Sequence, residues 1–324
     1  AGEVIARVSG LPWAEFIQHR IFEPLGMSGT VPTAAELHLQ PDVAMPHYEI
    51  DGDVEVIENA SVDAIGAAGS IWSSVDDMSR WIRLLLDHGV TPDGDTLISP
   101  ETIDELFTPQ AIVRSGFYPT ARLTNPHWTT YGLGWFQADY RGRAVDFHTG
   151  SIDGMVAIVG LIRDENLGVC VLANLDHAEL RHALMYRVFD LFDEGPPRDW
   201  SSELKELYAG IRADAEERRV AAEARRVEGT SPSLPLDRFV GSYADRLHGE
   251  VTISIDGAGL RLFYGPGLQG PLSHWHYDTF RVDWDADWRG SGYLSFVLNV
   301  AGEPSVLEMG GARFFRQPGG SEGG

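Results

Sequence analysis

The chain has 324 residues, of which 43% are hydrophobic and 23% charged, so it has the composition of a globular protein rather than a disordered or fibrous one. Its formal net charge of -23 argues against nucleic acid or an anionic membrane as the main partner, because the sequence has no basic stripe to displace counterions. The single cysteine, Cys170, excludes an intramolecular disulfide, and no apolar run reaches the roughly 18 residues of a membrane helix. These features leave the cellular compartment open.

The length predicts two domains, and the first part of the chain begins with helices. Residues 1–8 form an amphipathic pattern that ends at Gly10, a typical C-cap glycine. This pattern has no N-cap residue, so we expect the chain to begin within a domain. Residues 13–22 predict a second helix, broken at Pro24.

Residues 28–65 are rich in loop-forming residues, with a predicted hairpin at residues 48–56 about Asp51 and Gly52. Such an excursion is either one wall of a substrate cleft or a surface insertion. Ser74 is the predicted N-cap of a helix at 75–86, with Asp77 at the capping-box position.

The centre of the chain predicts an antiparallel sheet. Residues 144–148 read as a strand, Ser151 to Gly154 as the turn after it, and residues 155–162 as an apolar strand covered on both faces. Residues 169–172 return antiparallel, and a helix at 178–192 covers the sheet. Helices around an antiparallel sheet give an α+β fold.

The tripeptide His148-Thr149-Gly150 stands at the predicted end of the first of these strands. Glycine allows a ligand to approach the backbone closely, threonine offers a hydroxyl, and the N–H of Ser151 can point at a developing oxyanion. Together these groups are suited to binding a carbonyl.

The last third of the chain has a different pattern. A linker and a charged connector helix occupy residues 196–232. Residues 233–317 contain about eight short strands with regular turns, which indicates a small β-barrel. We expect residues 318–324 to be a disordered tail.

His148-Thr149-Gly150, preceded by the sequence Tyr131-Gly-Leu-Gly-Trp135, resembles the third motif of the serine β-lactamase and penicillin-binding-protein superfamily. The similarity is closest to its class C-like esterase and peptidase branch, and residues 1–10, 21–27 and 66–78 agree with that branch in the same order. The resemblance covers residues 1–195 and implies the C-terminal part of a β-lactamase-like catalytic domain, with its N-terminal portion missing. Residues 233–317 resemble the lipocalin-like barrel attached to many members.

The resemblance implies acyl transfer through a serine on a Ser-x-x-Lys helix, assisted by a Tyr-x-Asn loop. Both lie upstream of the third motif in the family, and neither region is present in this chain. Ser202-Glu-Leu-Lys205 matches in letters alone, and we interpret Ser202 as a helix cap and Lys205 as a surface charge. The chain by itself is therefore expected to be hydrolytically inert.

By position, the resemblance assigns His148 to the catalytic Lys or His of the motif. Thr149 and Gly150 line the acyl group, and Ser151 supplies one oxyanion N–H. A structural histidine is the alternative for His148. Histidine in place of lysine favours an esterase or peptidase over a β-lactamase, with a small-molecule ester, peptide or β-lactam-like substrate.

Two further sequence patterns resemble a cofactor site and a metal site, but we expect neither a cofactor nor a metal. Residues 265–270 match a dinucleotide motif in letters, but no helix follows. His274 and His276 share a predicted strand without a third ligand at recognisable spacing. Two interpretations are open for the aromatic residues near Trp275 and Phe280. They either line a ligand cavity or pack the core of the barrel, and we favour packing. A non-catalytic protein that binds a ligand in the barrel is the alternative function, and a homo-oligomer is left open.

Overall fold

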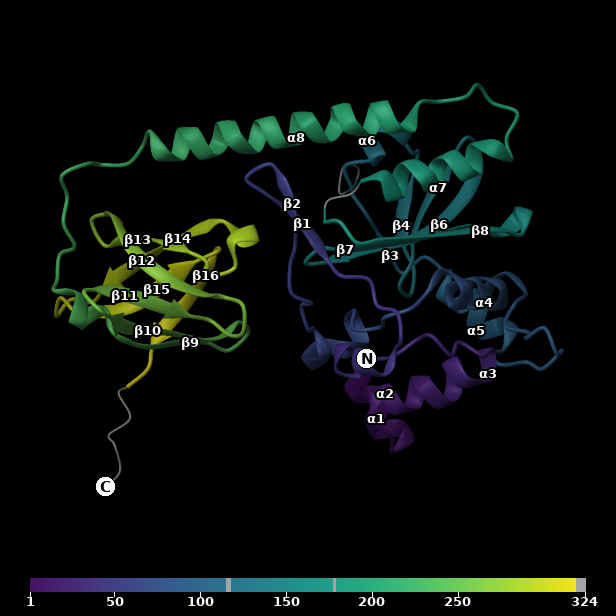
Figure 1. Ribbon diagram of the computed structural model, residues 1–324, viewed down its shortest axis with the longest axis horizontal. Coiled ribbons are helices and arrows are strands. Elements are labelled where there is room, and N and C mark those ends of the chain that lie inside the picture. Colours follow the sequence, from purple (N-terminus) through teal and green to yellow (C-terminus); the bar gives the residue numbers. More distant parts are fainter. Residues whose placement is uncertain (115–117, 177–178, 319–324) are drawn as a thin grey trace. The chain divides into compact units, whose positions relative to one another are not determined.

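The computed structural model describes residues 1–114, 118–176 and 179–318. The chain divides into two compact units, Ala1–Arg212 and Ala213–Gly324 (Figure 1). The first contains a six-stranded antiparallel sheet with helices, and the second a closed eight-stranded barrel. The predicted α+β fold with an appended β-barrel is confirmed. Residues 319–324 of the predicted tail, and residue 178 at the predicted start of a helix, lie outside the described residues.

The helical elements of the first unit precede, interrupt and follow the sheet. In chain order they are α1 (Gly2–Ser9), α2 (Trp13–Ile17), η1 (Gln18–Phe22), α3 (Glu23–Leu25), η2 (Ala34–Leu39), η3 (Asp63–Ala68), α4 (Val75–Leu86), α5 (Pro100–Leu106), α6 (Ala121–Thr124), η4 (Arg163–Glu165), α7 (Leu180–Leu191) and α8 (Trp200–Glu223), which continues into the second unit.

The sheet has the strand order β3-β4-β5-β6-β7-β8, and each strand is antiparallel to its neighbours. Its strands are β3 (Ala111–Ile112), β4 (Thr129–Tyr131), β5 (Phe136–Tyr140), β6 (Arg143–Ile152), β7 (Met155–Ile162) and β8 (Leu167–Ala173). A separate hairpin of β1 (His47–Ile50) and β2 (Asp53–Val56) turns at Asp51 and Gly52, both with positive φ, as their types predict.

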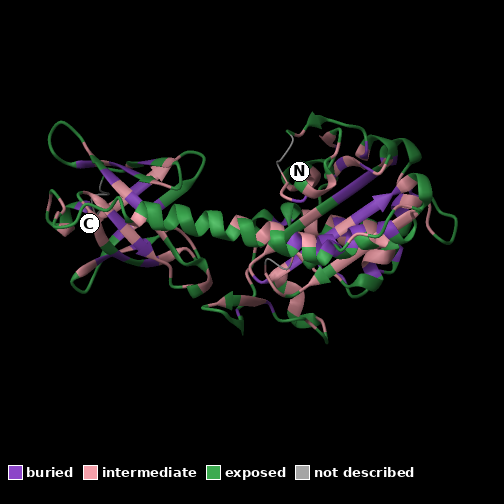
Figure 2. Cartoon of the chain, turned by 90° about the horizontal axis from the view of Figure 1, so that it is seen from above, coloured by how far each residue is buried: buried purple, intermediate pink, exposed green. Residues whose placement is uncertain are grey.

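Strand β7 is covered on both faces, because successive side chains of a strand point to opposite sides. Ile158 and Ile162 pack with Met185 and Phe189 of α7 in one core cluster. Leu161 belongs to a second cluster with residues of α4 and α5, and Val159 packs against it. Figure 2 shows purple, buried stretches among pink, partly buried ones in the strands of the sheet. The continuous apolar sequence of β7 follows from this two-sided burial.

Two glycines let the helices approach the sheet. A Cβ at Gly160 would lie 2.5 Å from Met185 Sδ, and a Cβ at Gly168 would lie 2.4 Å from Ile82 Cγ2. Each glycine therefore makes room for a side chain from one of the two covering helices, α7 and α4.

Strand β6 is longer than the sequence indicated. It continues through the His-Thr-Gly tripeptide to Ile152 and pairs with β7 over that whole stretch. The turn consists of Asp153 and Gly154 alone, so the prediction of a turn from Ser151 to Gly154 and of a motif at the strand end is wrong. Ser151 pairs with Val156 and so continues the ladder between β6 and β7. This paired arrangement is more stable than an open four-residue loop.

Two helix details also differ from prediction. The helix that begins at Trp13 passes through Pro24 and ends at Gly26, with φ 66°. Pro24 stands at the start of α3, where its missing N–H costs little. Ser202 is not the cap of α8, because its N–H and hydroxyl both donate to the Asp199 carboxylate, at 3.1 and 2.8 Å.

The first turns of α8 are part of the core of the first unit. Trp200 and Leu204 are buried with α7, and the Trp200 ring stacks on Tyr186 at a centroid distance of 4.6 Å. The buried Asp190 carboxylate accepts from Trp200 Nε1 at 2.7 Å and from the Tyr140 hydroxyl at 2.6 Å. Beyond residue 211, α8 is exposed along most of its length (Figure 2).

The second unit is a closed barrel in which β9 completes the ring by pairing with both β10 and β16. Its elements are η5 (Leu236–Phe239), β9 (Gly241–Asp245), β10 (Gly249–Asp256), β11 (Gly259–Phe263), β12 (Gln269–His276), β13 (Thr279–Asp283), η6 (Asp287–Arg289), β14 (Ser291–Leu298), β15 (Pro304–Met309) and β16 (Ala312–Arg316).

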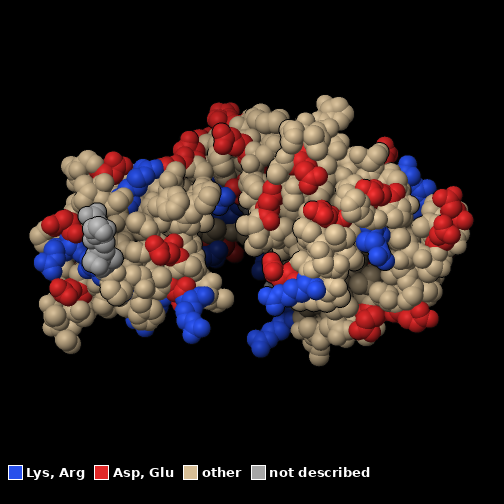
Figure 3. Space-filling view, turned by 90° about the horizontal axis from the view of Figure 1, so that it is seen from below, with Lys and Arg blue, Asp and Glu red and all other residues tan. Residues whose placement is uncertain are grey.

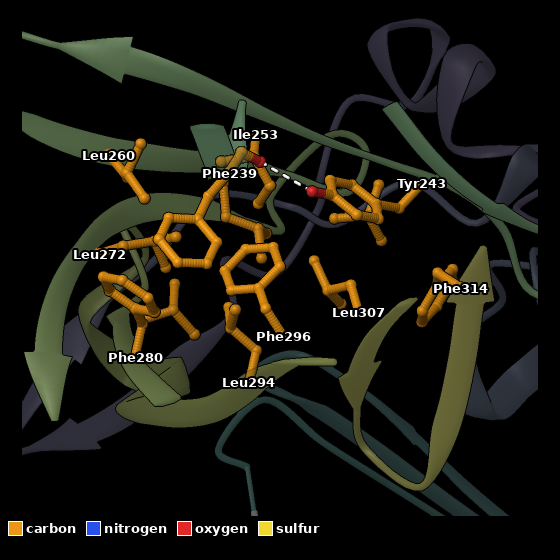
Figure 4. Close-up of a cluster of buried hydrophobic side chains, with 13 residues drawn as sticks. Phe239, Tyr243, Ile253, Leu260, Leu272, Phe280, Leu294, Phe296, Leu307 and Phe314 are labelled. Carbon is orange, nitrogen blue, oxygen red and sulfur yellow. Dashed lines mark hydrogen bonds between the residues drawn. The ribbon is translucent and has the colours of Figure 1, made fainter. Parts of the chain in front are cut away.

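Buried side chains fill the interior of the barrel. Figure 4 shows Phe239, Phe280 and Phe296 in mutual contact at its centre, with centroid distances from 4.7 to 5.7 Å. The Tyr243 hydroxyl donates to the Phe239 carbonyl oxygen at 2.9 Å, which fixes the short helix η5 to β9. These aromatic residues therefore pack the core, as a small barrel requires.

The two histidines of β12 have structural partners. A register irregularity separates them, His274 Nε2 lies 2.8 Å from the Tyr277 carbonyl oxygen, and His276 Nδ1 accepts from the Val227 N–H at 3.3 Å. Within the described ranges, no three His, Cys, Asp or Glu side chains gather closely enough to hold a metal ion.

Side chains of both signs are interspersed on the face shown in Figure 3. In the described parts of the chain, no helix combines the length and the apolar character that crossing a membrane requires.

We predict that Gly154→Ala destabilises the first unit more than Gly142→Ala. Both glycines have positive φ, at 78° and 76°, so both substitutions strain the backbone, by about 1 kcal/mol. A Cβ at Gly154 would also lie 2.5 Å from Pro46 Cβ, whereas a Cβ at Gly142 meets nothing within 4 Å. We expect an additional loss of about 1–3 kcal/mol for Gly154→Ala, measured by denaturant unfolding. Equal losses of unfolding free energy in the two variants would show that residues 46–47 move aside without cost.

Candidate functional site

A cleft of about 740 Å³ opens beside the ends of strands β6, β7 and β8. The strands contribute one wall, which includes His148, Gly150, Ser151 and Ile152. The opposite wall comes from residues between positions 29 and 44 and between 62 and 73. Three of the four predicted site residues therefore line one cavity of ligand size.

Strand β6 extends beyond its neighbour β5 at this end of the sheet. The pairs between β5 and β6 end at Phe136 opposite Phe147. Residues 148–152 continue to pair with β7 on one side, and most of them line the cleft. A ligand in the cleft lies against the ends of β6, β7 and β8.

The alternation of the strand divides the predicted motif between two faces of the sheet. His148 and Gly150 pair with Val159 and Ala157, on the face that α4 covers farther along the sheet. Thr149 pairs with Ile158, on the face that α7 covers. The structure thus brings His148 and Gly150 into the cleft and places Thr149 on the opposite face.

The Thr149 hydroxyl makes hydrogen bonds to the neighbouring strand β7 and to helix α7. It donates to the Ala157 carbonyl oxygen at 2.9 Å and accepts from Arg181 Nε at 3.0 Å. Its only hydrogen is therefore used within the protein, and the side chain ties β6 to both β7 and α7. In this geometry the Thr149 side chain does not face the cleft. It affects the cleft by fixing the position of strand β6.

The Arg181 guanidinium is buried within a small polar cluster at the start of α7. Glu179 Oε2 lies 3.7 Å from Arg181 Nη2 and 3.3 Å from His182 Nδ1. Burial lowers the pKa of His182, which favours the neutral form of this histidine. The charge of Arg181 is then balanced by Glu179, as a buried ion requires.

The ring of His148 is held by aromatic residues of β4 and β5. The Tyr131 hydroxyl lies 3.4 Å from His148 Nδ1, and the Phe136 ring stacks on the imidazole at a centroid distance of 6.3 Å. When Tyr131 donates to Nδ1, a neutral His148 carries its proton on Nε2. That tautomer presents an N–H donor at the second ring nitrogen.

Gly150 leaves the cleft open at the centre of the motif. A Cβ at this position would meet no atom within 4 Å, so a larger side chain would project into free space. Its φ is not in the left-handed region, so the backbone conformation itself does not require glycine. Glycine here provides access to the strand backbone beside Ser151.

The opposite wall is fixed by Asp77 of α4. Its buried carboxylate accepts from the Gly29 N–H and from the Thr30 hydroxyl, both at 2.8 Å. The Ser74 hydroxyl accepts from the Asp77 N–H at 3.2 Å and so caps α4, as predicted. The carboxylate, however, binds the 29–30 turn rather than completing a capping box, and this contact anchors the wall that contains Gly29 and Val31.

Sequence reasoning did not identify Tyr131 or Arg181 as parts of the site. Tyr131 belongs to the sequence that flanks the motif, and its place on the strand beside the short β5 is the signal that could have suggested contact with His148. Arg181 lies 32 residues after Thr149, and only the packing of α7 on the sheet brings the two together.

The comparisons with known proteins agree with this geometry. Residues 1–191, more than half of the chain, match the family model described as Beta-lactamase. The chain belongs to the Beta-lactamase family. This is a family of serine hydrolases, and the match covers the cleft and the strand that carries His148. Residues 225–317 match a second model, described as a domain of unknown function, DUF3471, which covers the barrel.

The curated relatives that this chain matches are distant and longer. Unguisins hydrolase of Aspergillus violaceofuscus is 26% identical over 80% of this chain and 48% of its own length. Penicillin-binding protein 4 of Amycolatopsis lactamdurans is 25% identical over 53% of this chain and 44% of its own length. The chain thus spans about half the length of these relatives.

Among solved structures, the octameric penicillin-binding protein homologue from Pyrococcus abyssi is similar in fold. It shares 20% identity and a TM-score of 0.50, over 97% of this chain and 62% of that chain.

We predict that Thr149→Val lowers the free energy of unfolding by about 1–3 kcal/mol, because the buried Arg181 Nε loses its acceptor. Thr149→Ser keeps the hydroxyl and is the matched control, with an expected loss below about 1 kcal/mol. Urea unfolding of both variants measures the difference. Equal stability of Thr149→Val and the wild type would show that the contact contributes nothing net.

Proposed function

We propose that this chain is part of a serine hydrolase that cleaves an ester or an amide through an acyl-enzyme. The cleft along residues 148–152 is its substrate-binding wall, and the serine nucleophile comes from sequence outside these 324 residues. The observation that carries the proposal is that His148, Gly150 and Ser151 of β6 line one cleft in a chain of the Beta-lactamase family. Residues 1–195 remain our proposed extent for this part of the catalytic domain.

The reaction has two halves. The serine oxygen forms a bond to the substrate carbonyl carbon, and its proton passes through a base to the leaving alcohol or amine. Water then attacks the acyl-enzyme, releases the acid and restores the serine. In each half the carbonyl oxygen becomes negatively charged, so backbone N–H donors beside it lower the barrier.

The residues of this chain have distinct roles in the proposal. His148 donates a hydrogen bond or a proton from the cleft wall, in an orientation set by Tyr131. Gly150 admits the acyl group to the strand, and the Ser151 N–H is one oxyanion donor. Thr149 positions this segment through its bonds to Ala157 and Arg181.

Histidine in place of lysine in the motif supports an esterase or a peptidase rather than a β-lactamase. An imidazole lacks the permanent charge that lysine offers a substrate carboxylate. The filled interior of the barrel supports the hydrolase over the alternative of a ligand carrier.

A fluorophosphonate probe tests where the nucleophile lies. We expect the 324-residue chain to remain unlabelled, because its one Ser-x-x-Lys sequence begins at the exposed Ser202, whose hydroxyl donates to Asp199. The protein isolated from its natural source should carry one label, located by intact mass and peptide mapping on a serine outside residues 1–324. Heat-denatured protein is the control. Stoichiometric labelling of the 324-residue chain would overturn this part of the proposal.

Substitution of His148 in the natural protein tests its catalytic role. We expect His148→Ala to lower kcat/KM for an ester substrate by about 10²–10⁴-fold, the usual contribution of a general acid or base. His148→Lys, which restores the other residue of the family motif, should recover part of that loss. If the His148→Ala variant and the wild type have equal kcat/KM, His148 is a structural histidine.

A further inference from the structure

We infer that the cleft selects an apolar group that carries no carboxylate, and that it tolerates a positive charge near Asp42. On the walls that this chain contributes, the favoured ligands would then be neutral or cationic amides and amines with an apolar portion. The assignment of this ligand as the substrate rests on the proposed function, whereas the binding preference itself does not.

The first observation is the apolar lining. Val31, Trp72, Ile152 and Met155 contribute to the walls. Ile65, Ile71 and Leu172, which also line the cleft, are 65%, 46% and 38% exposed. A ligand that covers these side chains removes apolar surface from water, so an apolar group is the favoured occupant.

The second observation is the charge of the lining. Among the described residues that line the cleft, Asp42 and His148 are the only ones with an ionisable side chain, and none is an arginine or lysine. The buried Arg181 guanidinium lies near the motif, but it binds Thr149 on the other face of the sheet. The permanent charge on these walls is therefore negative.

These two features disfavour a bound carboxylate. An anionic group that enters an apolar cleft loses hydration, and this lining gives it no fixed cation in return. The net charge of -23 adds a repulsive field at long range. A neutral amide keeps its apolar contacts without this cost, and an ammonium group gains attraction to Asp42.

Three ligands with one carbon skeleton test the preference on the 324-residue chain. They are 4-phenylbutanoate, 4-phenylbutanamide and 4-phenylbutylamine, titrated at pH 8 and moderate salt. Binding is followed by tryptophan fluorescence, because Trp72 lines the cleft. We expect the amide to bind at least about tenfold more tightly than the carboxylate, and the amine at least as tightly as the amide. Trp72→Phe should remove most of the signal.

Asp42→Asn tests the source of the preference for a cation, with Asp93→Asn as the matched control on an exposed loop away from the cleft lining. Asp42→Asn should weaken binding of the amine by about two- to fivefold, as expected for an exposed ion pair, and leave the amide unchanged. Asp93→Asn should change neither affinity.

The inference is overturned if the carboxylate binds as tightly as the amide, or if none of the three ligands binds saturably. An unchanged affinity of the amine for Asp42→Asn overturns the assignment of the cation preference to Asp42. These results are independent of catalysis, since they measure binding alone. Failure of the proposed function would appear instead as a natural protein that is not labelled by the fluorophosphonate.

Discussion

The two-sided burial of strand β7 is the constraint on which the first unit depends. Its side chains alternate between the α7 face and the face covered by α4 and α5, so every strand paired with it inherits that alternation. On β6, the register fixes which residues can serve a ligand and which must pack. His148 and Gly150 face the cleft, and Thr149 is committed to Arg181 and to the sheet.

Local patterns in the sequence were sufficient for most of the fold. The apolar run of β7, the capped helix after Ser74 and the Asp51-Gly52 turn each follow from a short stretch with a known preference. The eight short strands with regular turns likewise predicted the barrel. These features depend on neighbouring residues in the chain, which is why they can be read without a structure.

The site was only partly predictable, because its geometry depends on contacts between distant segments. The length of β6 is set by pairing with β7, and glycine at position 150 suggested a strand end where the ladder in fact continues. The bond from Arg181 to Thr149 depends on how α7 packs, and Asp77 binds a turn 47 to 48 residues earlier in the chain. No local pattern encodes these partners.

The burial of Trp200 and Leu204 has a consequence for how such chains are rearranged in evolution. The Beta-lactamase match ends at residue 191, yet the hydrophobic core of the first unit includes the start of α8. A gene fusion or excision at residue 191 would leave the Asp190 carboxylate without its indole donor and the Tyr186 ring without its stacking partner. The part that can be exchanged as a folded unit therefore extends past the family boundary, at least through residue 204.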